Sequence, residues 1–98
     1  MTPPLTLRDI AQAEIEEAFG HYEEQRPGLG HRFLAAVATA LAEVEEFPWR
    51  YPKVRGEIRR ALVAGFPYSI LYIAEPEQTI VIACFHARRD PRHWHNRR

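Results

Sequence analysis

The side chains best suited to chemistry gather near the end of the chain. There the sequence reads His86-Ala-Arg-Arg-Asp-Pro-Arg-His-Trp-His95. Guanidinium groups make paired hydrogen bonds to phosphates and carboxylates, and an indole ring stacks on nucleic-acid bases. We therefore predict that Arg88, Arg89 and Arg92, with Trp94, form a recognition surface for an acidic partner.

A structural role competes for part of the same segment. Asp90 can pair with Arg88 or Arg89 and start a turn before Pro91, and Trp94 can pack the tail against a sheet. We expect this structural role for Asp90, Pro91 and Trp94, and recognition for the arginines.

The segment also contains three histidines, His86, His93 and His95. Their spacing is not a standard zinc spacing, and the neighbouring guanidinium charges oppose a bound cation. We predict no metal site, and the sequence indicates no cofactor.

RNA cleavage is a second chemistry that these residue types can support. It needs a proton donor and acceptor beside an arginine that holds the scissile phosphate. The candidate set is His86, Tyr68 and Arg60, with Arg59 as the alternative arginine. Tyr68 and Tyr72 fall on one face of a predicted strand, and we favour half-buried packing for both tyrosines.

Arg59 and Arg60 are neighbours in a predicted strand, so their side chains point to opposite faces. One interpretation is an edge strand that its charge protects from association. The other is recognition, and both arginines stay in the predicted recognition set.

Bulk properties limit the class of protein. The 98 residues suffice for one domain, over residues 1–98. No apolar run is long enough to span a membrane, no secretory signal is visible, and the single Cys84 suits a reducing cytoplasm and a buried position. Residues 1–52 carry a net charge of −5 and residues 53–98 carry +5. Before position 86 the simpler interpretation is that the two halves neutralise each other, whereas the arginines after position 86 favour an acidic partner.

Apolar spacing predicts two helices that must position these groups. One spans about residues 8–25 and the other about 29–47, separated by Pro27 and Gly28, so they form an antiparallel hairpin. Their acidic residues are most simply a solvated face.

Strand patterns follow the helices. Residues 5–7 form a short first strand, residues 49–56 a connector, and three strands are predicted at about 58–63, 68–74 and 79–85. Short connections require an antiparallel meander. The last strand is apolar on both faces, so we expect it to be central or covered on both sides. The fold class is α+β, with the hairpin on a three- to four-stranded antiparallel sheet and a basic C-terminal tail.

Several of these residues together resemble a known family. The relevant segments are Phe66-Pro-Tyr68 entering a strand, Ile70-Leu-Tyr-Ile73, and His86-x-Arg-Arg-Asp-Pro-x-x-Trp94 after the last strand. Upstream residues fit as well, namely Ala11, Glu14, Ile15, Ala18, Tyr22, residues 28–34, Pro48, Tyr51 and Pro52. The chain resembles the RelE/ParE superfamily of bacterial toxins, in its ParE-like branch.

The resemblance implies the toxin of a type II toxin–antitoxin module, held by a cognate antitoxin. ParE-like members are implied to inhibit DNA gyrase by protein contact, without catalysis. Alternatives are a ribosome-dependent mRNA endonuclease of the RelE kind and a non-toxic binding or stabilisation module. A homodimer and a toxin–antitoxin heterotetramer both remain open as assemblies. Nuclease members carry more basic residues on the sheet, whereas Tyr68-Ser-Ile70 has none, so the sequence favours a protein that is not an enzyme.

Overall fold

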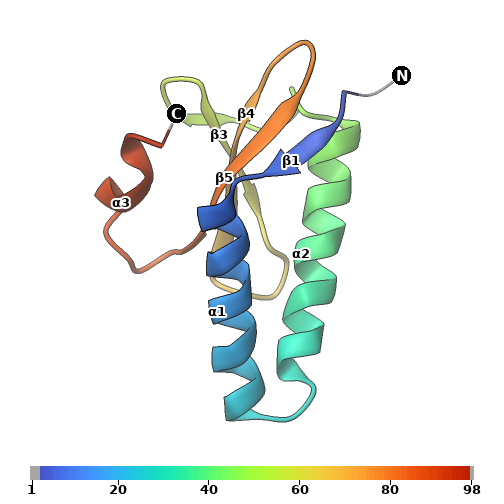
Figure 1. The fold of residues 1–98 in the computed structure, drawn as a ribbon, viewed down its shortest axis with the longest axis vertical. Helices are drawn as coiled ribbons and strands as arrows, with labels where there is room; N and C mark the ends of the chain where they lie inside the picture. Colours follow the sequence, from blue (N-terminus) through green and yellow to red (C-terminus); the bar gives the residue numbers. More distant parts are fainter. Residues whose placement is uncertain (1–2, 98) are drawn as a thin grey trace.

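The protein consists of two long helices, a five-stranded sheet and a short C-terminal helix. Figure 1 shows how the helices and the sheet are arranged. The computed structural model describes residues 3–97. In chain order the elements are β1 (Leu5–Leu7), α1 (Asp9–Gln25), α2 (Leu29–Glu46), β2 (Lys53–Arg55), β3 (Ile58–Leu62), β4 (Tyr68–Ala74), β5 (Thr79–His86) and α3 (Arg92–His95). The predicted α+β class and the helical hairpin are confirmed.

The hairpin of α1 and α2 turns tightly because one carboxylate closes it. Gly28, with a φ of 90°, adopts the left-handed conformation at the start of α2. The Glu23 carboxylate accepts hydrogen bonds from the backbone N–H groups of Gly28 and Gly30, both at 2.9 Å. These bonds satisfy donors at the start of α2 and lower the pKa of Glu23.

The strand order in the sheet is β1-β5-β4-β3-β2. The pairings β2–β3, β3–β4 and β4–β5 are antiparallel, which confirms the predicted meander, whereas β1 runs parallel to β5. The sheet therefore has five strands instead of the predicted three or four. β2 was missed because Lys53–Arg55 is only three residues long and has no buried side chain, so it gives no apolar pattern to recognise.

The last strand, β5, lies between β1 and β4 and is covered on both faces, as predicted. Leu71 pairs with Ala83 and Tyr72 pairs with Val81, so Ile82 is an extra residue that makes a β-bulge. The bulge shifts the alternation, which places both Val81 and Cys84 on the face that the hairpin covers.

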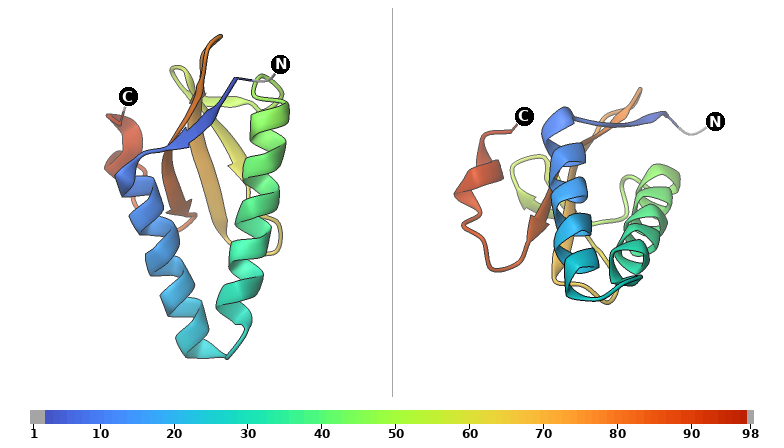
Figure 2. Two further views of the ribbon diagram at one scale, coloured as in Figure 1. Left: turned by 45° about the vertical axis from the view of Figure 1, so that its right-hand side comes forward. Right: turned by 60° about the horizontal axis from the view of Figure 1, so that its bottom comes forward.

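Each face of the sheet has its own apolar cluster. On the hairpin face, α1 and α2 pack against residues of the sheet such as Ile70, Tyr72 and Val81. On the opposite face, which we call the tail face, α3 covers Ile58, Leu71, Ile82, Ala83 and Phe85 with Trp94. Figure 2 shows α3 on the side of the sheet away from the two long helices.

Candidate functional site

The basic tail is held on the sheet by its own aspartate and tryptophan. The Asp90 carboxylate accepts a 2.9 Å hydrogen bond from the Arg92 backbone N–H and pairs with the Arg92 guanidinium at 2.6 Å. These contacts lower the pKa of the Asp90 carboxyl. They also fix the first turn of α3, which buries Trp94 to 8% exposure. The structural role expected for Asp90 and Trp94 is confirmed, but Asp90 pairs with Arg92 and not with Arg88 or Arg89.

A cavity of about 210 Å³ lies between the tail and the tail face of the sheet. It is lined by Arg60, Ser69, Leu71, Phe85, His86, Ala87, Arg89, Pro91 and Trp94. The guanidinium of Arg89 lies 4.9 Å from the centre of the Phe85 ring, a cation–π distance. Three residues of the predicted recognition set, Arg60, Arg89 and Trp94, therefore meet in one cavity.

The other predicted recognition residues lie apart from this cavity. Arg59 belongs to the hairpin side of β3, where its guanidinium donates hydrogen bonds to the carbonyl oxygens of Trp49 and Tyr51. Because β3 lies between β2 and β4, the interpretation of Arg59 and Arg60 as an edge-strand pair is wrong. Arg88 is exposed, and Arg92 is exposed and paired with Asp90.

The sheet separates the members of the nuclease set. Tyr68 packs against the hairpin cluster, whereas Arg60 lines the cavity on the tail face. The ring of His86 makes an edge contact with Tyr68 at 5.1 Å, and its Nδ1 accepts a hydrogen bond from the Arg88 N–H. Burial raises the pKa of Tyr68, which keeps the phenol protonated. The set is thus not assembled around one point.

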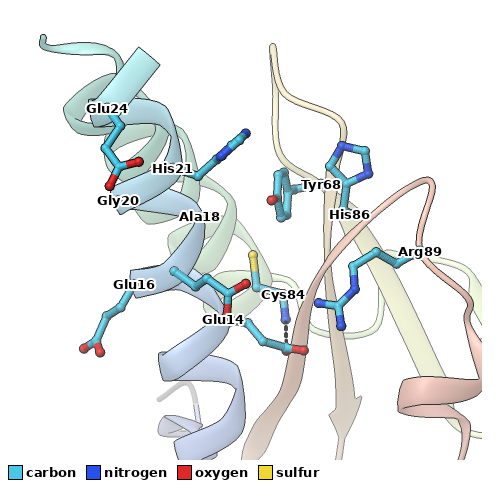
Figure 3. A pocket seen from close by; sticks show the side chains of 11 residues that line it. Glu14, Glu16, Ala18, Gly20, His21, Glu24, Tyr68, Cys84, His86 and Arg89 are labelled. Atoms are coloured by element: carbon cyan, nitrogen blue, oxygen red, sulfur yellow. Dashed lines mark hydrogen bonds between the residues drawn. The ribbon is translucent and has the colours of Figure 1, made fainter. Parts of the chain in front are cut away.

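A larger groove, of about 540 Å³, runs between α1 and the ends of β4 and β5 (Figure 3). Its α1 wall carries four glutamates, and its opposite wall carries Tyr68, His86 and Arg89. Cys84 lies in its floor, where burial raises the thiol pKa to about 12. The thiol is therefore protonated and unreactive at neutral pH, which agrees with the buried position predicted for Cys84.

A contact between residues far apart in the sequence joins α1 to Arg97. Glu14 Oε1 accepts hydrogen bonds from the Cys84 N–H at 3.1 Å and from Arg97 at 2.9 Å, and Arg97 also donates to the Ile82 carbonyl. These groups lie on β5 just beyond Val81, the last residue that pairs with β1. Glu14 and Arg97 therefore bind backbone groups on the edge of β5 that β1 does not reach. The two residues are 83 positions apart, so no local pattern predicts their contact.

Neither a metal-binding group of side chains nor a membrane-spanning helix is found within residues 3–97. No group of three or more His, Cys, Asp or Glu side chains in this range is placed to hold a metal ion. No helix in the same range is long and apolar enough to cross a membrane.

Comparison with known proteins decides the family. Residues 5–91 match the family described as "ParE toxin of type II toxin-antitoxin system, parDE". The chain belongs to the ParE toxin family. No match was found among curated proteins.

A solved structure supports the same fold. The chain is similar to the structure titled "Chromosomal ParDE TA system from P. aeruginosa", with a TM-score of 0.77 and 11% sequence identity. The similarity covers 89% of this chain and 98% of the other. At this identity the likeness concerns the fold alone, and it matches the arrangement expected for a ParE toxin.

Proposed function

We propose that this ParE-family protein arrests growth by protein contact with DNA gyrase and that a cognate antitoxin neutralises it. The observation that carries the proposal is the family match over residues 5–91. In this proposal the basic tail, with Arg88 and Arg89, is the surface that meets the target. Its charge favours rapid association with an acidic surface.

The geometry favours contact over RNA cleavage. A general base and a general acid must both come within hydrogen-bond reach of the scissile group. Tyr68 is packed against the hairpin and Arg60 is on the opposite face, so a phosphate held by Arg60 has no phenol beside it. The ribosome-dependent endonuclease is therefore the weaker candidate.

Antitoxin binding is supported by the family match. Ile10 on α1, Leu34 on α2 and Leu62 on β3 are exposed apolar side chains that such a partner can cover. Because the antitoxin binds the folded toxin, the complex should unfold at a higher temperature than the toxin alone.

Two assays in parallel test the target. Purified protein should inhibit gyrase supercoiling or trap gyrase-linked DNA breaks, and should leave mRNA on programmed ribosomes intact. His86→Ala should retain the gyrase effect. Codon-specific mRNA cuts by the wild type that disappear in His86→Ala would establish the nuclease instead.

A variant pair tests the surface. The triple variant Arg88→Ala, Arg89→Ala, Arg92→Ala should lose growth inhibition while the domain remains folded. The double variant Arg88→Ala, Arg89→Ala, which keeps the Asp90–Arg92 pair, should lose it as well. The matched control replaces three exposed arginines on and beside the hairpin by alanine, namely Arg26, Arg32 and Arg50. It removes the same charge and should stay toxic. Equal loss in both variants would indicate a net-charge effect instead of a tail-specific contact.

The antitoxin is tested separately by co-expression with the protein encoded beside this gene. Co-purification and a raised melting temperature are expected. A wild-type chain that is harmless when expressed alone, yet binds the neighbouring protein, would indicate a non-toxic binding module.

A further inference from the structure

The cavity on the tail face is lined by two arginines and by apolar side chains. Arg60 comes from β3 and Arg89 from the segment after β5, while Leu71, Phe85 and Trp94 form apolar walls. No aspartate or glutamate lines the cavity. Within residues 3–97, neither Arg60 nor Arg89 forms an ion pair with an acidic side chain. The cavity therefore offers two guanidinium groups to an anion from outside.

The size of the cavity limits what can enter it. Pockets for drug-sized ligands and cofactors have volumes of roughly 300–1,000 Å³. At about 210 Å³ this cavity is smaller and suits one or two side chains. Buried anchor residues in such pockets contribute much of the binding energy of protein–protein interfaces.

We propose that this cavity binds a short protein segment in which a large apolar side chain stands beside an aspartate or glutamate. The apolar side chain lies in the cavity against the small exposed parts of Phe85 and Trp94, which are 4% and 8% exposed, and the carboxylate pairs with Arg60 and Arg89. Charge complementarity selects the acidic group, because the lining is cationic and has no carboxylate of its own. The inference rests on the proposed function, in which the protein acts by protein contact, and it specifies the chemistry of the contact.

The rigidity of the site supports this assignment. Trp94 is held by α3, whose start is fixed by the Asp90–Arg92 pair. The Arg89 guanidinium lies over the Phe85 ring, 4.9 Å from its centre, and this contact favours its position before any partner arrives. Such preorganisation reduces the entropy that binding must overcome.

The test uses the full chain and two blocked tripeptides, N-acetyl-Leu-Glu-Leu-amide and N-acetyl-Leu-Gln-Leu-amide. The Trp49→Phe variant leaves Trp94 as the sole indole, so its fluorescence reports on the cavity. Backbone amide NMR shifts locate the bound peptide. The Glu peptide should bind at least about tenfold more tightly than the Gln peptide, because the Gln side chain carries no charge to pair with the two arginines. The shifts should centre on Leu71, Phe85 and Trp94.

Three variants and one control sharpen the result. Arg60→Gln and Arg89→Gln should each reduce the preference for the Glu peptide, and Arg50→Gln, at an exposed arginine outside the cavity lining, should preserve it. Ala87→Phe keeps both arginines but adds bulk to the exposed rim, and it should weaken both peptides. If an arginine variant fails to fold, the peptide pair on the wild type and Ala87→Phe still decide the question.

Two results would overturn the inference. One is equal affinity for the Glu and Gln peptides, or shifts that centre outside the cavity. The other is tighter binding of an octathymidylate than of the Glu peptide, lost in Arg60→Gln, which would identify a nucleic-acid site. Either result leaves antitoxin co-purification and growth arrest unchanged, whereas failure of the proposed function appears in those two assays.

Discussion

The ion pair of Glu14 and Arg97 should contribute more to the free energy of unfolding than an exposed surface ion pair does. Their side chains are only 12% and 15% exposed, and their charged atoms are 2.9 Å apart. Exposed pairs contribute about 0–1 kcal/mol, whereas breaking a buried pair by removing one partner costs about 3–5 kcal/mol. Because both side chains are still partly accessible, we expect the more destabilising single variant to lose about 2–4 kcal/mol of unfolding free energy.

The two single variants should differ because the partners are anchored differently. In Arg97→Gln the Glu14 carboxylate stays on α1, facing β5, and keeps only the Cys84 N–H as a donor. In Glu14→Gln the amide oxygen can still accept a hydrogen bond from the Cys84 N–H, and Arg97 can turn its long, flexible side chain into water. Arg97→Gln should therefore be the more destabilising change.

A double-mutant cycle by urea denaturation measures the coupling. The double variant leaves neither charge unpaired and should recover about 1–3 kcal/mol relative to the sum of the singles. In a domain of this size each 1 kcal/mol corresponds to a shift of about 4–8 °C in the melting temperature. Lys53 and Glu57, whose side chains are 47% and 56% exposed, supply the control cycle, with coupling of about 0.5 kcal/mol or less. Additive effects at Glu14 and Arg97 would refute the reasoning.

Three further predictions address the core and the hairpin. Trp94→Ala should cost about 3–5 kcal/mol of unfolding free energy, because the ring is 8% exposed; a loss below about 1 kcal/mol would mean that α3 does not pack on the sheet. Gly30→Ala should destabilise by about 1–3 kcal/mol, because its Cβ would meet the Phe19 carbonyl oxygen at 2.7 Å. Gly20→Ala, with nothing within 4 Å of its Cβ, should instead stabilise α1 by about 0.5–1 kcal/mol, and the pair is compared by thermal melting. Burial raises the pKa of Tyr72 from 10.0 to about 12. The protonated phenol therefore contributes its full stability below pH 10, and this contribution is lost as the pH rises toward 12. Tyr72→Phe should remove this pH dependence of the unfolding free energy, measured by denaturation at each pH.

The elements that the sequence predicted well are those with a repeated apolar pattern. The stripe Ala11, Ile15 and Ala18 is buried in α1, and the continuous apolar run of β5 is covered on both faces, as its composition required. The elements that escaped prediction have no such pattern. β2 is three exposed residues, and its place at the sheet edge depends on pairing with β3 across a turn at Gly56.

The candidate site was predictable in composition but not in geometry. Side-chain alternation correctly put Arg59 and Arg60 on opposite faces, yet only the packed structure shows that Arg59 is used to bind backbone carbonyls. The β-bulge at Ile82 and the contact of Arg97 with Glu14 depend on tertiary packing. Local propensity therefore cannot reveal which arginines remain available to a partner.

The tail, which we propose as the recognition surface, is fixed at several points. The Asp90–Arg92 pair and buried Trp94 hold α3 against the tail face, and Arg97 then ties the chain end to α1 and β5. Between β5 and these anchors, Arg88 and Arg89 occupy a short segment whose ends cannot move far. A partner that pairs with Arg89 would therefore order little additional chain on binding, which lowers the entropic cost of association. Arg97→Gln should consequently weaken target binding, even though Arg97 does not line the cavity.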